Sequence, residues 1–565
     1  MYLNLKEVPF SRYGSYFAFS HFINAGGISN DDLYLRTIHG GEHSLPLLKI
    51  LMTQDGKIVD YKENASPHVL KLEAGECSAE ICIPEPRVIR VRGSHCGLRL
   101  KVGTQNFKSA YRYKDTHYEL NAYSHKLLLT PLKGTLKVDA PWESTSCQYV
   151  TADFLPDENG ELEFALEEYL SSWIPREYTE SFDNCVDAVK KDFDKWISET
   201  LPVPQKYQES RELAAYINWS SVVSPSGHIK RDTMFMSKNW MCNVWSWDYC
   251  FNSMALAKGN PEQCWNQFMY LVDYQDNIGS IPDCLNDMSQ IWGFVKPPIQ
   301  GWALNWMMER TGFIDDAKLR QIYGPLCMLT DWWMNFHDTD GDGLPEYYHG
   351  NDSGWDNSTV FKDGIPIASP DLAAFLVIQM EVLAKAARRL GFTADAAGWD
   401  SRAEALLQLC VGKLWTGDGF SARLAGSGEL IKSDSLITYM PVLLGHRLPG
   451  DILAVLINKL KDKNLFLTDF GLATEIPSSE FYKADGYWRG PIWAPSTMLI
   501  VDGLISAGEK ELAREISLKF CEMIKKSGMA ENFDAQSGDG LRDRAYTWTS
   551  SVFLMLANEL LPAGE

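Results

Sequence analysis

The spacing of apolar residues changes once along the chain, from a period of two to a period near 3.6. Up to about residue 165, runs such as "LYLRTIHG", "AEICIPEPRVIRVRG" and "GLRLKVG" alternate apolar and polar positions between turn residues. Such runs predict the strands of an antiparallel sheet with one buried face. We therefore predict a β-sandwich-like N-terminal domain over residues 1–165.

Helical spacing begins in "LEEYLSSWIPREYTESFDNCVDAVKKDFDKWISETLPVP" and continues almost to the C-terminus. This first stretch predicts a linker helix region over residues 166–204, which prolines close near residue 204. About twelve further periodic segments follow, among them "DLAAFLVIQMEVLAKAARRL" and "GDILAVLINKL", separated by loops rich in Gly, Pro and Asp. An even number of helices without strands is typical of a double-layered toroid. We therefore predict a mainly α fold whose larger domain covers residues 205–565.

The composition supports a globular protein and excludes several kinds of partner. The chain has 565 residues with 45% hydrophobic and 22% charged residues, values typical of folded domains with large cores. Its formal net charge of -21 would repel the phosphate backbone of nucleic acids, so we expect no nucleic-acid partner.

The N-terminal residues "MYLNLKEVPFSRYGSYFAFS" do not form a signal peptide, and no apolar stretch approaches a membrane-spanning length. We therefore expect a cytoplasmic protein without a membrane partner. The twelve cysteines are dilute, and their spacing matches no zinc motif. Buried free thiols are the simplest interpretation.

Four long loops are unusually rich in tryptophan and polar residues, a composition that is commonly functional. In "NVWSWDYCFNSMALA", Trp247 and Asp248 lead into a helix, where Asp248 either serves a site or caps the helix. In "KPPIQGWALNWMMER", Gln300 and Trp302 follow a rigid diproline, and packing in the core is the alternative role for the tryptophan.

The longest loop is "HDTDGDGLPEYYHGNDSGWDNSTVF", and its first half resembles a calcium-binding loop. Asp338, Asp340 and Asp342 followed by Gly343 match the start of that pattern, although His349 stands where a closing Glu belongs. The sequence thus allows a structural calcium ion at these three aspartates. The alternative is a set of Asx-turns that shape the loop without metal.

The second half of this loop places Asp356 after Trp355 and before Asn357. An aromatic wall can desolvate a neighbouring carboxyl and raise its pKa, as a general acid at neutral pH requires. The alternative is that Asp356 caps a turn.

The fourth loop region comes in two pieces, "FGLATEIPSSEFYKADGYWRGPIWAPS" and "GMAENFDAQSGDGLRDRAYTWTSSVF". Tyr487, Trp488, Arg489 and Trp493 combine aromatic faces with a guanidinium group, which suits a sugar ring and its hydroxyl or carboxylate groups. A structural aromatic cluster is the alternative. Glu531 belongs to the second piece and is unremarkable by itself. Stacking aromatics with paired carboxylates favour a small carbohydrate substrate over phosphate or hydride chemistry.

Taken in order, the motifs "WSWDYCF", "KPPIQGWA", "DGLPEYYHGNDSGWDNS", "GYWRGPIW" and "AENFDAQSG" with "YTWTS" resemble the catalytic domains of glycoside hydrolase family 63. The resemblance is strongest to its mannosylglycerate and glucosylglycerate hydrolase branch and to processing α-glucosidase I, and weaker to family 37 trehalases. It spans about residues 206–560 and implies an (α/α)6 barrel with inverting, exo-acting α-glycosidase activity of the α-glucosidase type. No cofactor is required for that chemistry.

The resemblance also implies roles for individual residues. It makes Asp356 the general acid and Glu531 the general base. Phe533 departs from the tyrosine common after the base, which concerns recognition of the leaving group. The implied substrate contacts are Trp247, Asp248, Gln300, Trp302, Trp355, Asn357, Tyr487, Trp488, Arg489, Trp493 and Trp548.

Three other functions fit parts of the pattern. An inverting disaccharide phosphorylase would need no base at Glu531 and would need a basic phosphate pocket. A sugar isomerase or epimerase would need loop histidines, and His349 is the one histidine within these motifs. A non-catalytic protein would bind carbohydrate through the aromatic residues alone.

Overall fold

The computed structural model describes residues 1–23, 29–41, 46–103, 106–114, 116–122 and 125–559. The chain divides into two compact units. Unit 1 comprises Met1–Ser198 and Ala215–Cys242, and unit 2 comprises Glu199–Ala214 and Asn243–Glu565. This division differs from the predicted boundaries, because the helix expected in the linker belongs almost wholly to unit 1 and residues 215–242 return to it.

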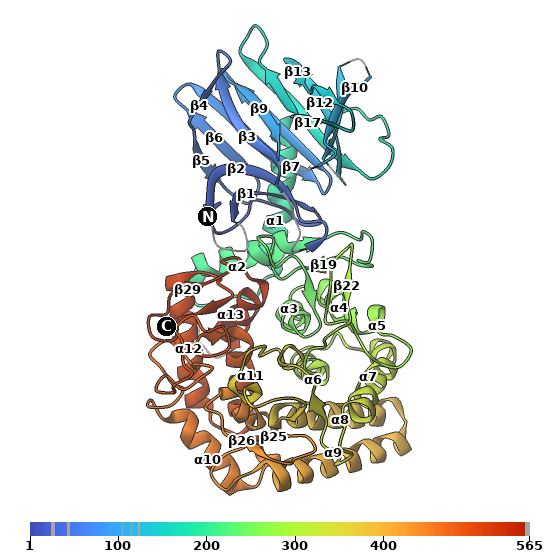
Figure 1. Ribbon diagram of the computed structural model, residues 1–565, viewed down its shortest axis with the longest axis vertical. Helices are drawn as coiled ribbons and strands as arrows, with labels where there is room; N and C mark the ends of the chain where they lie inside the picture. Colours follow the sequence, from blue (N-terminus) through green and yellow to red (C-terminus); the bar gives the residue numbers. More distant parts are fainter. Residues whose placement is uncertain (24–28, 42–45, 104–105, 115, 123–124, 560–565) are drawn as a thin grey trace. The chain divides into compact units, whose positions relative to one another are not determined.

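Unit 1 contains two antiparallel sheets, as the alternating pattern predicts (Figure 1). The first has the order β1-β2-β3-β9-β16-β13, with β4 paired to β3. Its strands are β1 (Phe17–Ile23), β2 (Ser29–Thr37), β3 (Pro46–Gln54), β4 (Lys57–Val59), β9 (Gly97–Val102), β13 (Thr135–Asp139) and β16 (Thr151–Leu155).

The second sheet has the order β10-β11-β12-β17-β8-β7-β6-β5. Its strands are β5 (Lys62–Ala65), β6 (Leu70–Ala74), β7 (Cys77–Glu85), β8 (Val88–Ser94), β10 (Ser109–Lys114), β11 (His117–Ala122), β12 (His125–Lys133) and β17 (Glu161–Tyr169). Phe154 of the first sheet stacks on Phe164 of the second with ring centroids 3.6 Å apart, so the two sheets share one core. A short hairpin, β14 (Trp142–Glu143) with β15 (Ser146–Cys147), stands apart from both sheets.

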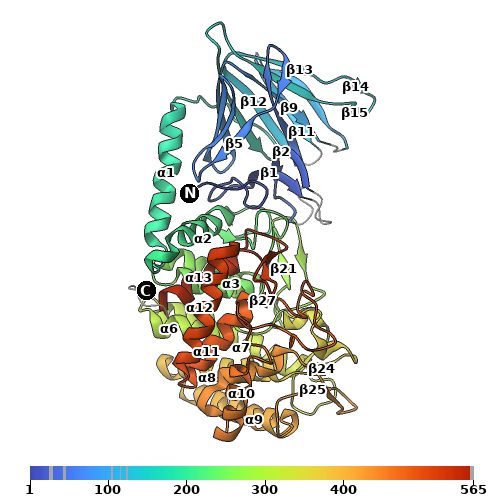
Figure 2. The ribbon, with the colours of Figure 1, turned by 90° about the vertical axis from the view of Figure 1, so that its left-hand side faces the viewer.

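Helix α1 (Phe182–Glu199) follows the sandwich and is seen along its length in Figure 2. Its buried residues Phe182, Cys185, Val189, Phe193 and Trp196 repeat every three or four positions. This is the spacing that places side chains on one face of a helix, which explains why the sequence pattern located α1.

Unit 2 contains an inner circle of six helices in which each contacts the next and the last contacts the first. The circle consists of α3 (Asp248–Leu256), α6 (Gln300–Arg310), α8 (Pro370–Leu390), the 3-10 helix η5 (Leu436–Arg447), α11 (Ala494–Ser506) and α13 (Thr547–Glu559). All nine residues of α3 are buried, and α8 is buried on almost every side, as expected of inner elements.

The outer helices alternate with the inner ones along the chain. They are α4 (Pro261–Phe268), α7 (Asp316–Phe336), α9 (Thr393–Leu414), α10 (Gly450–Lys461) and α12 (Lys510–Ser527). A short helix, α5 (Tyr270–Tyr274), extends α4, and α2 (Gln208–Ser221) precedes α3 in the chain. In Figure 1, α9, α10 and α12 lie at the periphery of the unit while α3, α6 and α11 lie inside it. The predicted double-layered arrangement is confirmed.

The loops of unit 2 contain short strands that the sequence pattern did not predict. One sheet joins β20 (Val244–Trp245), β21 (Cys284–Leu285) and β22 (Gln290–Ile291). A second joins β23 (Glu346–Tyr347), β24 (Ile367–Ala368), β25 (Ala422–Leu424) and β26 (Leu430–Ile431), and a third joins β27 (Ile492–Trp493), β28 (Asn532–Phe533) and β29 (Gly540–Leu541). Each sheet fixes a loop that carries one of the sequence motifs.

All twelve cysteines, each within the described residues, are free thiols, and all but Cys327 are buried. The prediction of buried free thiols is therefore confirmed. Among the described residues, the helices are all too short or too polar to cross a membrane.

Candidate active site

The loop "HGNDSGWDNS" is folded tightly around two glycines. A Cβ atom on Gly350 would lie 1.9 Å from the carbonyl oxygen of Asp356, and one on Gly354 would lie 2.6 Å from the ring of Trp247. Gly354 also has a φ of +71°, which disfavours other residues. Glycine at both positions lets the loop close on itself and lets Gly354 approach the Trp247 ring.

Asp352 anchors this loop from within. Its carboxylate accepts hydrogen bonds from the backbone N–H groups of Val295 (3.2 Å), Tyr348 (3.0 Å) and His349 (2.9 Å). The first bond ties the loop to the segment before α6, while the bond from His349 belongs to a capping box. Asp352 is therefore a structural carboxylate in the same loop as Asp356.

The Asp356 side chain is partly exposed at the end of this loop. Burial raises the pKa of the Asp356 carboxyl above its usual value. The Lys296 ammonium opposes this rise, and the negative charge of Asp283 adds to it. A carboxyl group with a raised pKa and partial access to solvent can donate a proton near neutral pH.

Lys296 and Asp283 form a buried ion pair beside Asp356, with Nζ and Oδ1 2.8 Å apart. Lys296 also donates to the carbonyl of Asn351 at 2.7 Å, so it holds the acid loop as well as compensating negative charge. Neither residue was predicted. Lys296 opens the quoted motif "KPPIQGWA", but a single lysine more often lies on the surface than in a site.

Asn357 joins the acid loop to the aromatic loop. Its Nδ2 donates to the carbonyl of Gly486 at 3.0 Å, and its Oδ1 accepts from the backbone N–H of Trp488 at 2.9 Å. Arg489 donates from Nε to the carbonyl of Asn357 at 2.6 Å. Both residues were predicted to contact substrate, and the structure engages both in bonds between the two loops.

Five of the predicted tryptophans form one continuous aromatic wall. Trp488 stacks on Trp493 with centroids 4.0 Å apart and planes inclined by 6°, and it also contacts Trp355 at 4.7 Å and Trp247 at 6.3 Å. Trp548 lies 5.5 Å from Trp493 and 6.0 Å from Trp247. The loops that carry these motifs therefore converge.

Two tyrosines extend this wall toward the acidic groups. Tyr487 packs edge-on against Trp493 at 5.0 Å, and Tyr546 lies 4.8 Å from Trp548. Asp356 and Glu531 both raise the pKa of the Tyr487 hydroxyl, with burial as the largest cause. The same phenol therefore lies in the field of both predicted catalytic carboxyls. Tyr546 was not predicted.

Glu531 is positioned by the small sheet that also holds the aromatic wall. In the β27–β28 pair, Trp493 lies opposite Asn532, the residue after Glu531. The indole N–H of Trp548 donates to the carbonyl of Glu531 at 3.3 Å. The sheet thus explains how a glutamate from the last loop reaches a site built by loops far earlier in the chain.

The Glu531 side chain is 3% exposed. The pKa of its carboxyl is raised to about 8: burial is the largest cause, Asp543 and Asp248 add to the rise, and Arg542 opposes it. A carboxylate with such a pKa is a strong base for its type once it is ionised.

Asp248 begins α3 without capping it. The N-cap position is Trp247, which makes no side-chain capping bond. The Oδ2 atom of Asp248 is buried and accepts no hydrogen bond within the described residues. Burial raises its pKa well above the usual value, with Lys296 opposing and Asp283 and Asp356 adding to the shift. The helix cap considered from the sequence is therefore not its role, and an unsatisfied buried carboxylate is suited to a ligand.

Gln300 and Trp302 lie on α6, outside the continuous wall. Gln300 is fully buried and donates to the carbonyl of Ser246 at 2.8 Å, next to Trp247 and Asp248. Trp302 donates its indole N–H to Asp502 at 2.7 Å and packs against Phe251 at 5.7 Å. The geometry of Trp302 matches the core-packing alternative.

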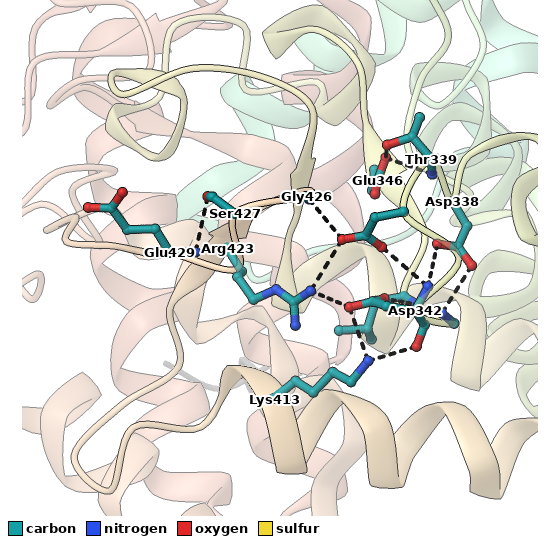
Figure 3. A network of polar contacts seen from close by, with 12 residues as sticks. Asp338, Thr339, Asp342, Glu346, Lys413, Arg423, Gly426, Ser427 and Glu429 are labelled. Atoms are coloured by element: carbon teal, nitrogen blue, oxygen red, sulfur yellow. Dashed lines mark hydrogen bonds and ion pairs between the residues drawn. The ribbon is translucent and has the colours of Figure 1, made fainter.

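The aspartates of "DTDGDG" form a network of their own (Figure 3). Asp338 accepts from the backbone N–H groups of Asp342 and Gly343. Asp340 and Asp342 each accept from the backbone N–H two residues on, as in Asx-turns. Asp342 is paired with Lys413 at 3.0 Å and with Arg423. One oxygen from each of Asp338, Asp340 and Glu346 lies within 4.8 Å of the others, so these three carboxylates can approach one ion. Calcium binding stays a prediction, and Asp342 already has two cationic partners.

Most of unit 2 is similar to known glycoside hydrolases. Residues 241–549 match the family described as the mannosylglycerate hydrolase MGH1-like glycoside hydrolase domain. A mannosylglycerate hydrolase of Thermus thermophilus is 21% identical over 394 residues, covering 55% of this chain and 93% of that protein. Mannosylglycerate hydrolase MGH2 of Selaginella moellendorffii is 20% identical over 401 residues, covering 55% of this chain and 79% of that protein.

Two solved structures share the fold. The GH63 mannosylglycerate hydrolase of Thermus thermophilus in complex with glucose superposes with a TM-score of 0.53 at 18% identity, over 60% of this chain and 98% of that one. A bacterial glucoamylase complexed with acarbose gives a TM-score of 0.64 at 13% identity, over 99% of this chain and 94% of that one. These matches confirm the predicted (α/α)6 barrel preceded by an antiparallel β-sandwich-like domain.

Proposed function

Because the chain belongs to the mannosylglycerate hydrolase MGH1-like family of glycoside hydrolases, we propose that it is an inverting, exo-acting α-glycosidase of the α-glucosidase type. Asp356 serves as the general acid and Glu531 as the general base. The substrate is a disaccharide, a short oligosaccharide or a small glycoside.

One observation carries this proposal. Two carboxyl groups from loops far apart in the sequence, Asp356 and Glu531, both raise the pKa of the Tyr487 phenol. Each has a raised pKa, which favours proton transfer near neutral pH. The aromatic wall beside them offers faces for a sugar ring, and Asp248 offers a free carboxylate oxygen for sugar hydroxyls.

The reaction proceeds as a single displacement. Asp356 gives its proton to the glycosidic oxygen as the bond from that oxygen to the anomeric carbon breaks. Glu531 takes a proton from a water molecule whose oxygen forms the new bond on the opposite face of the sugar. Such a water fits when the two carboxyls are about 6.5–9.5 Å apart, and its attack inverts the anomeric configuration.

The substrate class rests on the relatives and on the site. Relatives named mannosylglycerate hydrolases support a small glycoside, and a related structure was solved with glucose. Asp248, Asp356 and Glu531 make the site acidic, with Lys296 as a buried cation beside them. An uncharged sugar fits such a site better than a phosphorylated one, whose charge the carboxylates would repel.

The test is an NMR time course on a panel of α-linked disaccharides, glucosylglycerate and mannosylglycerate. We expect initial release of the β-anomer from a substrate of the panel. Initial release of the α-anomer would contradict the inverting mechanism, and phosphate-dependent release of a sugar 1-phosphate would identify a phosphorylase. Binding of panel sugars without cleavage would leave the carbohydrate-binding alternative.

Variants Asp356→Asn and Glu531→Gln test the two assignments on the substrate found in the panel. Each is expected to lower kcat by at least about a thousandfold while the thermal unfolding transition stays cooperative, because each removes one proton-transfer group. Asp451→Asn, an exposed residue in the first turn of the outer helix α10, is the matched control and should leave kcat unchanged. Full activity in either site variant would reject its assignment.

A further inference from the structure

The segment opposite Glu531 contains a β-bulge with an arginine at its extra position. In the β28–β29 pair, Asn532 lies opposite Leu541, whereas the backbone N–H of Glu531 donates to the carbonyl of Asp543 at 2.7 Å. Arg542 is therefore the inserted residue. Its φ is +60°, a left-handed conformation that glycine usually occupies in such bulges.

The arginine is held at this position by a second residue with left-handed backbone. Tyr487 has a φ of +63°, and the Arg542 guanidinium carbon lies 4.8 Å from the centroid of its ring. Arg542 is also ion-paired with Asp485 at 2.8 Å. Two non-glycine residues in a disfavoured conformation, in contact with each other and beside an active site, indicate that the side-chain arrangement serves a function.

The charges around Glu531 show what that function is. Asp543 and Asp248 face it with negative charge, Tyr487 and Tyr546 are the phenols in its field, and Arg542 is the cation that acts on it. A general base must be ionised before it can accept a proton from water. Without this positive charge, burial and the two aspartates would favour the protonated form of Glu531 still more strongly.

We propose that Arg542 is a positioning residue that favours the ionised form of Glu531, and that Asp485 and the Tyr487 ring hold its guanidinium in place for this purpose. This inference rests on the proposed function for its role in turnover. The bulge turns one residue out of the strand pairing, so a long cationic side chain can act on Glu531 without occupying the space that the attacking water needs.

With a substrate that needs no general acid, the pH dependence of the rate reports on the general base alone. The departure of fluoride from an α-glycosyl fluoride needs no proton from Asp356, so kcat/KM on such a substrate follows ionisation of Glu531 alone and rises with pH. Arg542→Gln should move the midpoint of this rise upward by about one pH unit, a tenfold lower rate on its acidic side, with the same plateau above it. Arg542→Lys should keep the midpoint near that of the wild type.

Two further variants separate the charge from the backbone. Arg542→Gly removes the charge and suits the left-handed conformation, so it should shift the midpoint as Arg542→Gln does while unfolding at a higher temperature. Arg388→Gln removes an arginine in the last turn of α8 from an exposed ion pair with Asp400 and should leave the midpoint unchanged. A uniform loss of rate at all pH values, with an unchanged midpoint in both Arg542→Gln and Arg542→Gly, would overturn the proposal.

An infrared titration decides the question without turnover. The carboxyl band that Glu531→Gln removes identifies Glu531, and its pH midpoint should be higher in Arg542→Gln than in the wild type. If the fluoride is not cleaved but this midpoint shifts, the proposed function fails and the electrostatic role of Arg542 stands. An unshifted midpoint contradicts that role whatever the activity.

Discussion

At the scale of single residues, the site holds more negative charge than its cations compensate. Burial raises the pKa values of Asp248, Asp356 and Glu531, and each of the three raises that of another acid or phenol in the group. Lys296 and Arg542 offset part of this effect. The carboxyl groups of the site therefore hold their protons to a higher pH than exposed carboxyl groups do, as acid and base chemistry in one site requires.

Retaining a proton at Glu531 has a consequence for stability. Its pKa is about 8 in the folded protein and near its ordinary value in the unfolded chain. The unfolded state therefore loses its proton first as pH rises, and the wild type loses stability between about pH 4.5 and pH 8. Glu531→Gln cannot ionise, so its melting temperature should exceed that of the wild type by an amount that grows across this range, reaching ~2 °C or more at pH 8.

Scanning calorimetry at several pH values measures this difference. Glu511→Gln, on the outer helix α12, is the matched control and should track the wild type at every pH. A Glu531→Gln variant that melts below the wild type at pH 8 would show that the ionised carboxylate stabilises the fold, contrary to the direction of the pKa shift.

At the scale of elements, the site depends on short sheets and on one asparagine between loops. Asn357 spans the acid loop and the aromatic loop through Gly486 and Trp488. Removing the Asn357 side chain leaves the Asp356 carboxyl and the Trp488 ring unchanged, but it breaks the bonds that keep the two loops together. A misplacement of about 1 Å can cost a hundredfold in rate.

We therefore expect Asn357→Ala to lower kcat ten- to a hundredfold with a smaller change in KM. Asn357→Asp keeps the acceptor for the Trp488 N–H and loses the donor to Gly486, so its kcat should lie between those of the alanine variant and the wild type. Steady-state kinetics distinguishes this role of Asn357 as a link between loops from the predicted contact with a sugar hydroxyl. That contact would appear as a higher KM with kcat nearly unchanged.

The helical period of apolar residues is clearer in the outer layer of the barrel than in the inner one, for a physical reason. Outer helices such as α10 and α12 bury one face, so their apolar residues repeat with a clear period. α3 and α11 are buried nearly all round, which removes the contrast that the period depends on. The two-residue strands of the loops are too short to show any alternation.

The site was predictable only in parts. The convergence of the aromatic motifs could be expected, because long polar loops of a barrel tend to carry function. The pair of Asp356 and Glu531 followed from family resemblance alone, since each is an ordinary acid in its own loop. Lys296 and Arg542 were missed because the sequence does not show which single cation is brought beside a carboxylate by the fold.

At the scale of the whole molecule, the chain passes between its two units more than once. Residues Glu199–Ala214 belong to unit 2, residues Ala215–Cys242 return to unit 1, and Asn243 begins the rest of unit 2. A cut near residue 204, at the end of the predicted linker, therefore divides unit 1 rather than separating the two units. The barrel sequence then keeps a segment whose native partners are gone.

Lys238 would lose most of its hydrogen-bond acceptors if the chain were cut there. Its buried ammonium donates to Ser11 Oγ (3.1 Å), to the carbonyls of Arg12 (3.2 Å) and Ser15 (2.5 Å), and to that of Val222 (3.5 Å). A truncated chain that begins at residue 205 loses the first three acceptors. Residues 215–242 would then be left without the sandwich core they belong to, so we expect limited proteolysis to cleave within them at once, whereas the full chain resists.

The point variant Lys238→Met separates the lysine from the lost sandwich. Methionine replaces a buried ammonium group and leaves the N-terminal residues in the chain. Burial lowers the pKa of that ammonium well below its usual value. If the hydrogen bonds of Lys238 alone keep residues 215–242 folded, this variant should be cleaved as fast as the truncated chain. We expect it to resist proteolysis far longer, because the strand pairing of β18 (Val222–Val223) with β19 (Thr233–Met234) and the buried side chains around it remain. A truncated chain that resists proteolysis and unfolds cooperatively would show instead that the barrel folds without unit 1.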